Sequence, residues 1–143
     1  MKNNFTTVSR IALWISFLAL PICAIPAFGS NAPASDAPQA VGSVAIPAGL
    51  SQNDVRESII AAFVGREWTV RDSAGDHVTG TIKHRGQEAI LTVNFSASQA
   101  DLLCQGWEIN SAGAHTKFEL PKRWIEYIKS DLAKNFLARS AKQ

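Results

Sequence analysis

Residues 68–95, WTVRDSAGDHVTGTIKHRGQEAILTVNF, decide the fold of this chain. They contain three runs in which apolar and polar side chains alternate, separated by turns at residues 73–76 and 85–87. Alternation with a period of two is typical of strands, and short Gly-, Ser- and Asp-containing turns join antiparallel neighbours. A fourth strand is expected over about 101–109, with its register left open by the adjacent Leu102 and Leu103. The sequence therefore predicts an antiparallel meander of three or four strands.

A helix is expected on each side of this meander. Over residues 52–64, Ser51 and Asp54 form the pattern of a capping box, and Gly65 marks the end. Over about 121–138, the apolar side chains recur at helical spacing. They are Trp124, Ile128, Leu132 and Phe136, widened by Ile125 and Leu137. The predicted fold class is α+β, a two-layer sandwich of helix, meander and helix with both helices on one sheet face.

The first 29 residues have the pattern of an export signal. A short basic segment that ends at Arg10 precedes an apolar core of ten residues, 11–20, in which Ser16 is the one polar residue; ten residues is the length of a signal-peptide core. Pro21 and Pro26 argue against a longer spanning helix. We expect cleavage after Gly29; the alternative is lipidation at Cys23, because Leu20 lies three positions before it as in a bacterial lipobox. We expect the protein to contact the membrane only if Cys23 is lipidated or the signal peptide remains uncleaved.

Residues 30–49 are dominated by Ala, Pro, Ser and Gly, and no large side chain precedes Val41. Such a segment buries too little apolar area to offset its ordering entropy. We therefore expect a flexible tether over 30–49, with a short edge strand at 44–46 as an alternative, followed by the α+β domain over 50–143.

Charge and cysteine content narrow the classes of partner. The chain has 14 Lys and Arg against 12 Asp and Glu, and cleavage removes Lys2 and Arg10, which leaves twelve of each sign. A neutral, exported domain excludes nucleic acid as the expected partner. Cys104 is then the one remaining cysteine, so no internal disulfide is expected. Its apolar neighbours favour a buried strand cysteine over a reactive thiol.

The polar residues form no recognisable catalytic pattern. His77, His84 and His115 are spread over separate segments, and residues 30–143 contain neither a Gly-x-Ser-x-Gly elbow nor a glycine-rich phosphate loop. We therefore expect a protein that is not an enzyme and that needs no metal or cofactor. The alternative is a small periplasmic enzyme whose site assembles from scattered groups such as His77, His84 and Asp76.

Two segments are candidates for a partner surface. Trp107 follows Gly106 in an irregular segment, where a bend would expose the indole ring to a partner; the alternative is that the ring fills the core. Lys122, Arg123 and Lys129 belong to a basic C-terminal segment that suits an acidic partner or anionic headgroups. The alternative for them is a solvated helix face.

Two short motifs, Arg66-Glu67-Trp68-Thr69-Val70 and Arg123-Trp124-Ile125, carry a resemblance to known proteins. With the export signal and the order of elements, residues 50–137 resemble a group of small, uncharacterised proteobacterial envelope proteins that are often described as lipoproteins. The resemblance implies location and fold, and no catalytic residues. We expect a periplasmic or secreted binding or accessory protein, or one anchored in the envelope, whose partner is an envelope protein or a small ligand.

Overall fold

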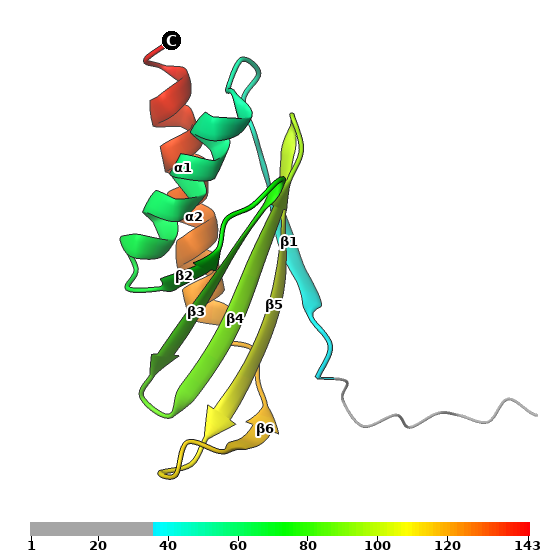
Figure 1. The fold of residues 1–143 in the computed structure, drawn as a ribbon, viewed down its shortest axis with the longest axis vertical. Helices are drawn as coiled ribbons and strands as arrows, with labels where there is room; N and C mark the ends of the chain where they lie inside the picture. The colour runs from blue at the N-terminus through cyan, green and yellow to red at the C-terminus, as the bar shows by residue number, and fades with distance from the viewer. Residues whose placement is uncertain (1–35) are drawn as a thin grey trace, which may run out of the picture. The chain divides into compact units, whose positions relative to one another are not determined.

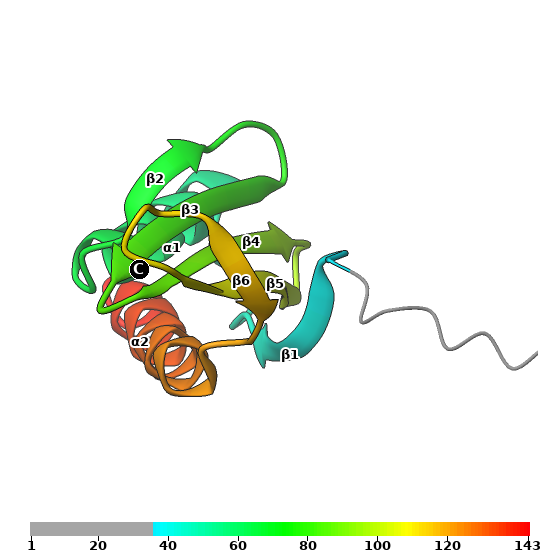
Figure 2. The same cartoon turned by 90° about the horizontal axis from the view of Figure 1, so that it is seen from below.

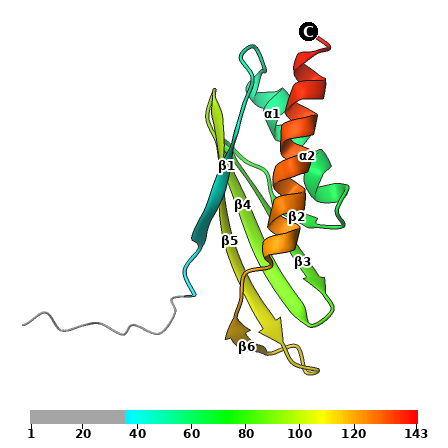
Figure 3. The ribbon, with the colours of Figure 1, turned by 180° about the vertical axis from the view of Figure 1, so that it is seen from behind.

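The computed structural model describes residues 36–143, so the predicted signal peptide, Cys23 and the cut after Gly29 lie outside the described residues. The elements follow one another as β1 (Gln39–Ala45), α1 (Gln52–Val64), β2 (Thr69–Asp72), β3 (His77–His84), β4 (Gln87–Phe95), β5 (Gln99–Ile109), β6 (His115–Phe118) and α2 (Lys122–Ser140). Both helices lie on the same face of one open antiparallel sheet (Figures 1 and 3). This confirms the predicted α+β class and the placement of the helices.

The sheet has six strands in the order β1-β5-β4-β3-β2, and β6 also pairs with β5. The predicted meander is therefore confirmed as the four strands β2–β3–β4–β5. The expected total of three or four strands is wrong for the sheet as a whole, because β1 and β6 add two strands to it. The two additional strands lie one after the other along the outer edge of β5 (Figure 3). There β1 pairs with the first half of β5, and β6 pairs with its last three residues. Figure 2, a view along the long axis, shows β2, β3, β4 and β5 following one another across the sheet.

The predicted tether over 30–49 is wrong for the residues that form β1. Gln39–Ala45 pair with β5, Val41 and Val44 pack against the core, and Ile46 is buried. The backbone N–H of Ile46 donates to Ser98 O at 2.8 Å. The alternative of an edge strand at 44–46 is thus confirmed in part, but the strand starts earlier, at Gln39, because ladder hydrogen bonds to an existing edge need no large side chains. The ordered domain therefore begins well before residue 50.

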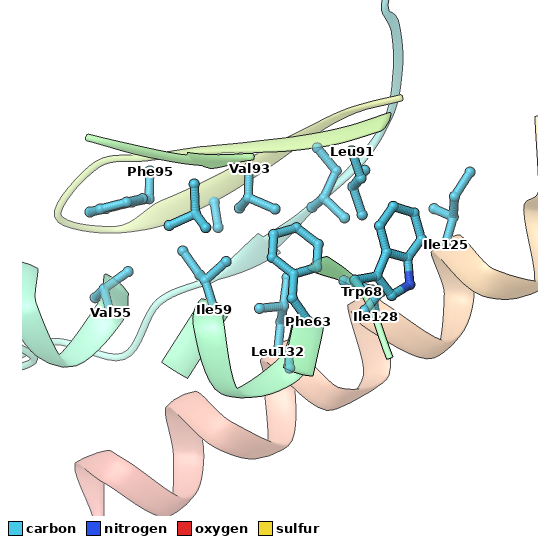
Figure 4. Packing of buried hydrophobic residues seen from close by; sticks show 14 of the residues in the cluster. Val55, Ile59, Phe63, Trp68, Leu91, Val93, Phe95, Ile125, Ile128 and Leu132 are labelled. Atoms are coloured by element: carbon cyan, nitrogen blue, oxygen red, sulfur yellow. The ribbon is translucent and has the colours of Figure 1, made fainter. Parts of the chain in front are cut away.

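The core fills the space between the helices and one face of the sheet. Alternate side chains of β4 (Leu91, Val93 and Phe95) point toward Phe63 of α1 and Leu132 of α2 (Figure 4). Gly80 of β3 lies directly under Phe63, because a Cβ at this position would be 3.2 Å from the ring. Trp68 belongs to this core and stacks on Phe63 with ring centroids 5.6 Å apart.

The helix boundaries largely follow the sequence signals. Ser51 and Asp54 form the predicted capping box at the start of α1. In α2 the apolar stripe is confirmed at Ile128, Leu132 and Phe136, but Leu137 is 65% exposed and does not widen it. It lies about 100° around the helix from Phe136, on a side that the sheet does not cover. None of the helices between residues 36 and 143 is both long and apolar enough to cross a membrane.

Candidate binding cleft

A cleft of about 200 Å³ opens where the turn after α1, the start of β2, the end of β3 and the start of α2 meet. These four segments are neighbours in both side views (Figures 1 and 3). We call it the corner cleft. Its lining consists of Arg66, Glu67, Trp68, Ile82, His84, Trp124 and Tyr127. Aromatic and aliphatic walls with a few polar groups are typical of sites for small molecules.

The chain turn after α1 places two of these residues. Glu67 has a φ of 63°, which is left-handed and costs a residue with a side chain roughly 1 kcal/mol. The turn is closed by the backbone N–H of Trp68, which donates to Phe63 O at 3.0 Å. Consequently Trp68 turns into the core, while Glu67 remains exposed at the rim of the cleft.

One wall of the cleft is formed by charged side chains that surround the ring of Tyr127. The guanidinium of Arg66 lies 4.8 Å from the centre of the Tyr127 ring, and its Nε donates to Asp131 Oδ2 at 2.5 Å. This ion pair lowers the pKa of Asp131 and raises that of Arg66. Arg123 also lies over Tyr127, at 5.5 Å, and donates to its hydroxyl. The wall is therefore held by contacts between α2 and the turn after α1.

The opposite side of the cleft is formed by His84 at the end of β3 and by Trp124 of α2. Their rings meet edge to face, with centroids 6.4 Å apart. Glu67, Ile82 and His84 also border a second hollow that continues onto the other sheet face, toward Arg71 and Lys83. The cleft is thus open at one end.

Trp107, one of the predicted surface residues, lies on the other sheet face. It is 8% exposed and is not part of the helix-side core. His115 stacks on its ring at 4.4 Å between centroids, and Phe118 meets it edge to face at 6.2 Å. Gly106 does not form a bulge, because β5 keeps regular register with β4 through this residue. Of the two alternatives for Trp107, the structure therefore supports burial, although within a small cluster of its own.

The structure does not gather the predicted basic residues with Trp107. Lys122 and Arg123 are exposed at the start of α2, on the helix side of the sheet. Lys129 lies farther along α2, next to Gly42 of β1, and forms an ion pair with Glu126 at 2.9 Å. A role for these residues in partner binding stays a prediction, but they do not form one surface.

The residues suggested for an assembled catalytic site do not converge. His77 contacts Asp72 at 2.9 Å and lies 3.9 Å from Asp76, at the start of β3. His84 is at the other end of the same eight-residue strand. At about 3.3 Å per residue, the two histidines are on the order of 20 Å apart. The site imagined around His77, His84 and Asp76 is therefore wrong.

Two further chemical features can be located. Within residues 36–143, no group of three or more His, Cys, Asp or Glu side chains is arranged to hold a metal ion. Cys104 is buried in the core, and burial raises the pKa of its thiol to about 12. The prediction of a buried strand cysteine is confirmed.

Comparison of this chain with models of protein families and with curated proteins finds no match. The resemblance to proteobacterial envelope proteins therefore stays a prediction that rests on short motifs. Both motifs nevertheless contribute to the corner cleft, through Arg66, Glu67 and Trp68 from one and Trp124 from the other. This shared tryptophan content was the one signal in the sequence that pointed to the cleft; nothing in the pattern indicated His84 or Tyr127.

Proposed function

We propose that this chain is an exported protein of the bacterial cell envelope that acts by binding, without catalysis, and that the corner cleft is its binding site. The observation that carries the proposal is the cleft itself, where two tryptophans and Ile82 form apolar walls beside Glu67 and His84. Concave apolar surfaces with a few convergent polar groups are the usual sites of ligand binding. The cleft volume favours a small ligand over an envelope protein as the partner.

Export is supported by the basic start, the ten-residue apolar core and the small residues before the expected cut after Gly29. After cleavage the protein would keep one cysteine, the buried Cys104. A single cysteine suits an oxidising compartment, because it cannot form an incorrect disulfide within the chain.

Binding rather than catalysis is supported by the surroundings of the reactive groups. The Cys104 thiol lies in the core with a raised pKa, so it is a poor nucleophile. His77 interacts with Asp72 far from the cleft. Within the cleft, His84 packs against an indole ring and has no hydrogen-bonded serine, threonine or cysteine among the described residues. Covalent catalysis by a serine, threonine or cysteine would need such a hydrogen-bonded pair.

The test combines location with binding. After osmotic shock of the producing bacterium, the protein is expected in the periplasmic or envelope fraction, with its N-terminal mass showing cleavage or lipidation. A low-molecular-weight extract of that compartment is expected to raise the melting temperature of the purified protein, because a ligand of the folded state stabilises it.

The matched variants are Trp124→Ala, which removes a cleft wall, and Leu137→Ala, which removes an exposed side chain of the same helix. The thermal shift should disappear in the first and persist in the second. A cytoplasmic location, or an equal shift in both variants, would contradict the proposal.

A further inference from the structure

We infer that the corner cleft binds a small uncharged molecule with an apolar or aromatic ring and a carbonyl oxygen, such as an amide, a lactam or a cyclic ketone. The inference rests on the proposed function, which makes the cleft a binding site, and adds the chemical class of the ligand. Three features of the cleft support it: an unpaired donor, balanced charge and small size.

The unpaired donor is the indole N–H of Trp68. The side chain is only 3% exposed and its N–H has no acceptor among the described residues, but the nitrogen is not fully enclosed and keeps a small contact with solvent. Figure 4 shows the indole nitrogen on the edge of the ring that faces α2, which forms the opposite wall of the cleft. An indole N–H that reaches a cleft can exchange its contact with solvent for a hydrogen bond to a bound ligand. Because the indole only donates, the ligand has to supply an acceptor atom.

The charges around the cleft favour an uncharged ligand. Among the lining residues, the charge of Arg66 is opposite to that of Glu67, and Arg66 is also paired with Asp131 at 2.5 Å. A cationic ligand would meet the guanidinium that already lies over the Tyr127 ring. An anionic ligand would meet the carboxylate of Glu67 at the rim. An ion of either sign is thus repelled by one of these side chains and attracted by the other, so little net attraction offsets the loss of its hydration.

The size and the walls define the body of the ligand. The cleft of about 200 Å³ is smaller than the sites that hold drug-sized molecules, which span about 300–1,000 Å³. A single ring fits this volume. Trp124 and Ile82 give the ring apolar contacts, and aromatic rings pair favourably edge to face or with offset stacking. The oxygen of the ligand then lies next to the Trp68 N–H.

The experiment uses four one-ring probes of similar shape: benzamide, toluene, benzoate and benzylammonium. The chain is expressed from its full sequence, labelled with ¹⁵N and titrated with each probe at neutral pH, while the indole N–H signals are followed by NMR. Benzamide is expected to shift the Trp68 signal with a dissociation constant of about 1 mM, as suits so small a ligand. The Trp107 signal, on the other sheet face, should not move.

The other probes are expected to bind at least fivefold more weakly than benzamide. Toluene lacks the acceptor, and the two ions meet the opposing charges of Arg66 and Glu67. Tighter binding of benzoate or benzylammonium, or equal binding of toluene, would overturn the inferred class but leave the corner cleft as a binding site. If no probe shifts the Trp68 or Trp124 signal, the inference is overturned, while export and the thermal response to the envelope extract are judged separately.

A variant pair tests the hydrogen bond. Trp68→Phe keeps an aromatic ring but removes the donor, so benzamide affinity should fall about fivefold to tenfold. Trp107→Phe makes the same change outside the cleft and should leave the affinity unchanged. Circular dichroism reports whether each variant folds; if Trp68→Phe does not, the probe order on the unaltered chain still decides the inference.

Discussion

Trp68 and Trp107 are both almost fully buried, yet they lie on opposite faces of the same sheet and in different surroundings. Trp68 lies beneath the helices, stacks on Phe63 and also borders the corner cleft. Trp107 lies on the face without helices and is covered by His115 and Phe118 of β6. Both rings are thus removed from water, one by the main core and the other by a short edge strand.

The comparison shows that the degree of burial does not reveal what a side chain does. The ring of Trp107 is closed off by its neighbours. The indole N–H of Trp68 has no acceptor among the described residues, although the rest of the side chain is packed in the core. We therefore expect stability to depend on both rings and ligand binding on Trp68 alone.

The largest expected effect comes from truncating each ring. Trp68→Ala should lower the free energy of unfolding by about 3–5 kcal/mol, because it leaves a cavity in the main core. Trp107→Ala should cost about 2 kcal/mol, since the ring contacts only a small cluster. Urea denaturation of both variants measures the difference. Equal losses of unfolding free energy in the two variants would contradict the expectation that Trp68 packs in the main core and Trp107 only in a small cluster.

The next effect concerns Gly106, the neighbour of Trp107. A side chain at position 106 would point to the helix side of the sheet. A Cβ there would lie 2.7 Å from Cδ of Pro121 and would also meet Glu119 O. Gly106→Ala should therefore destabilise the protein by about 2 kcal/mol, since backbone has to move. Asn94→Ala, at an exposed position of β4, should stay within about 0.5 kcal/mol of the unaltered chain. Chemical denaturation that gave similar values for both would contradict the close approach.

A smaller effect is expected when the cover of Trp107 is removed. His115→Ala removes the ring that stacks on Trp107 at 4.4 Å and should cost about 1 kcal/mol. The tryptophan emission should shift to longer wavelength as Trp107 meets water. In a Trp107→Phe background the same change should leave the emission unaltered; a shift that persists there would mean that another tryptophan responds.

The smallest effect is a pH dependence at the wall of the corner cleft. The hydrogen bond from Arg66 holds the pKa of Asp131 below its ordinary value of 3.8. A lowered pKa stabilises the folded state above pH ~4, and this contribution is lost as pH falls through the folded-state value. Asp131→Asn should thus cost less than about 1 kcal/mol at pH 7, and its difference from the unaltered chain should shrink as pH falls below ~4. Denaturation at neutral and at acid pH checks it, and a gap that persists in acid would assign the loss to packing.

Much of the fold could be predicted because its signals are local. The capping box of Ser51 and Asp54, the stripe of α2 and the alternation in β3 and β4 each involve residues close in the chain. By contrast, β6 was missed and β1 was expected only as an alternative at 44–46, because each is defined by pairing with β5 and neither has the side-chain alternation that marks an isolated strand. The exposed Leu137 was missed for a similar reason, because only the position of the sheet determines which helix side is covered.

The corner cleft shows the same limit. The sequence singled out Arg66-Glu67-Trp68 and Arg123-Trp124-Ile125 as motifs but had no means to place them together. It grouped His77 with His84, which the extended strand separates, and Trp107 with Lys122, which the sheet separates. Distances between such residues are set by strand length and sheet faces.

By itself the sequence determined the helix positions, the meander and the burial of Cys104, because hydrophobic periodicity and capping act over a few residues. Only the tertiary structure decided that β1 completes the sheet, that Trp107 is covered by His115, and that Trp68, His84 and Tyr127 share one cleft. The physical reason is that pairing at an edge and the meeting of two layers join segments far apart in the chain, and no local pattern encodes which segments meet.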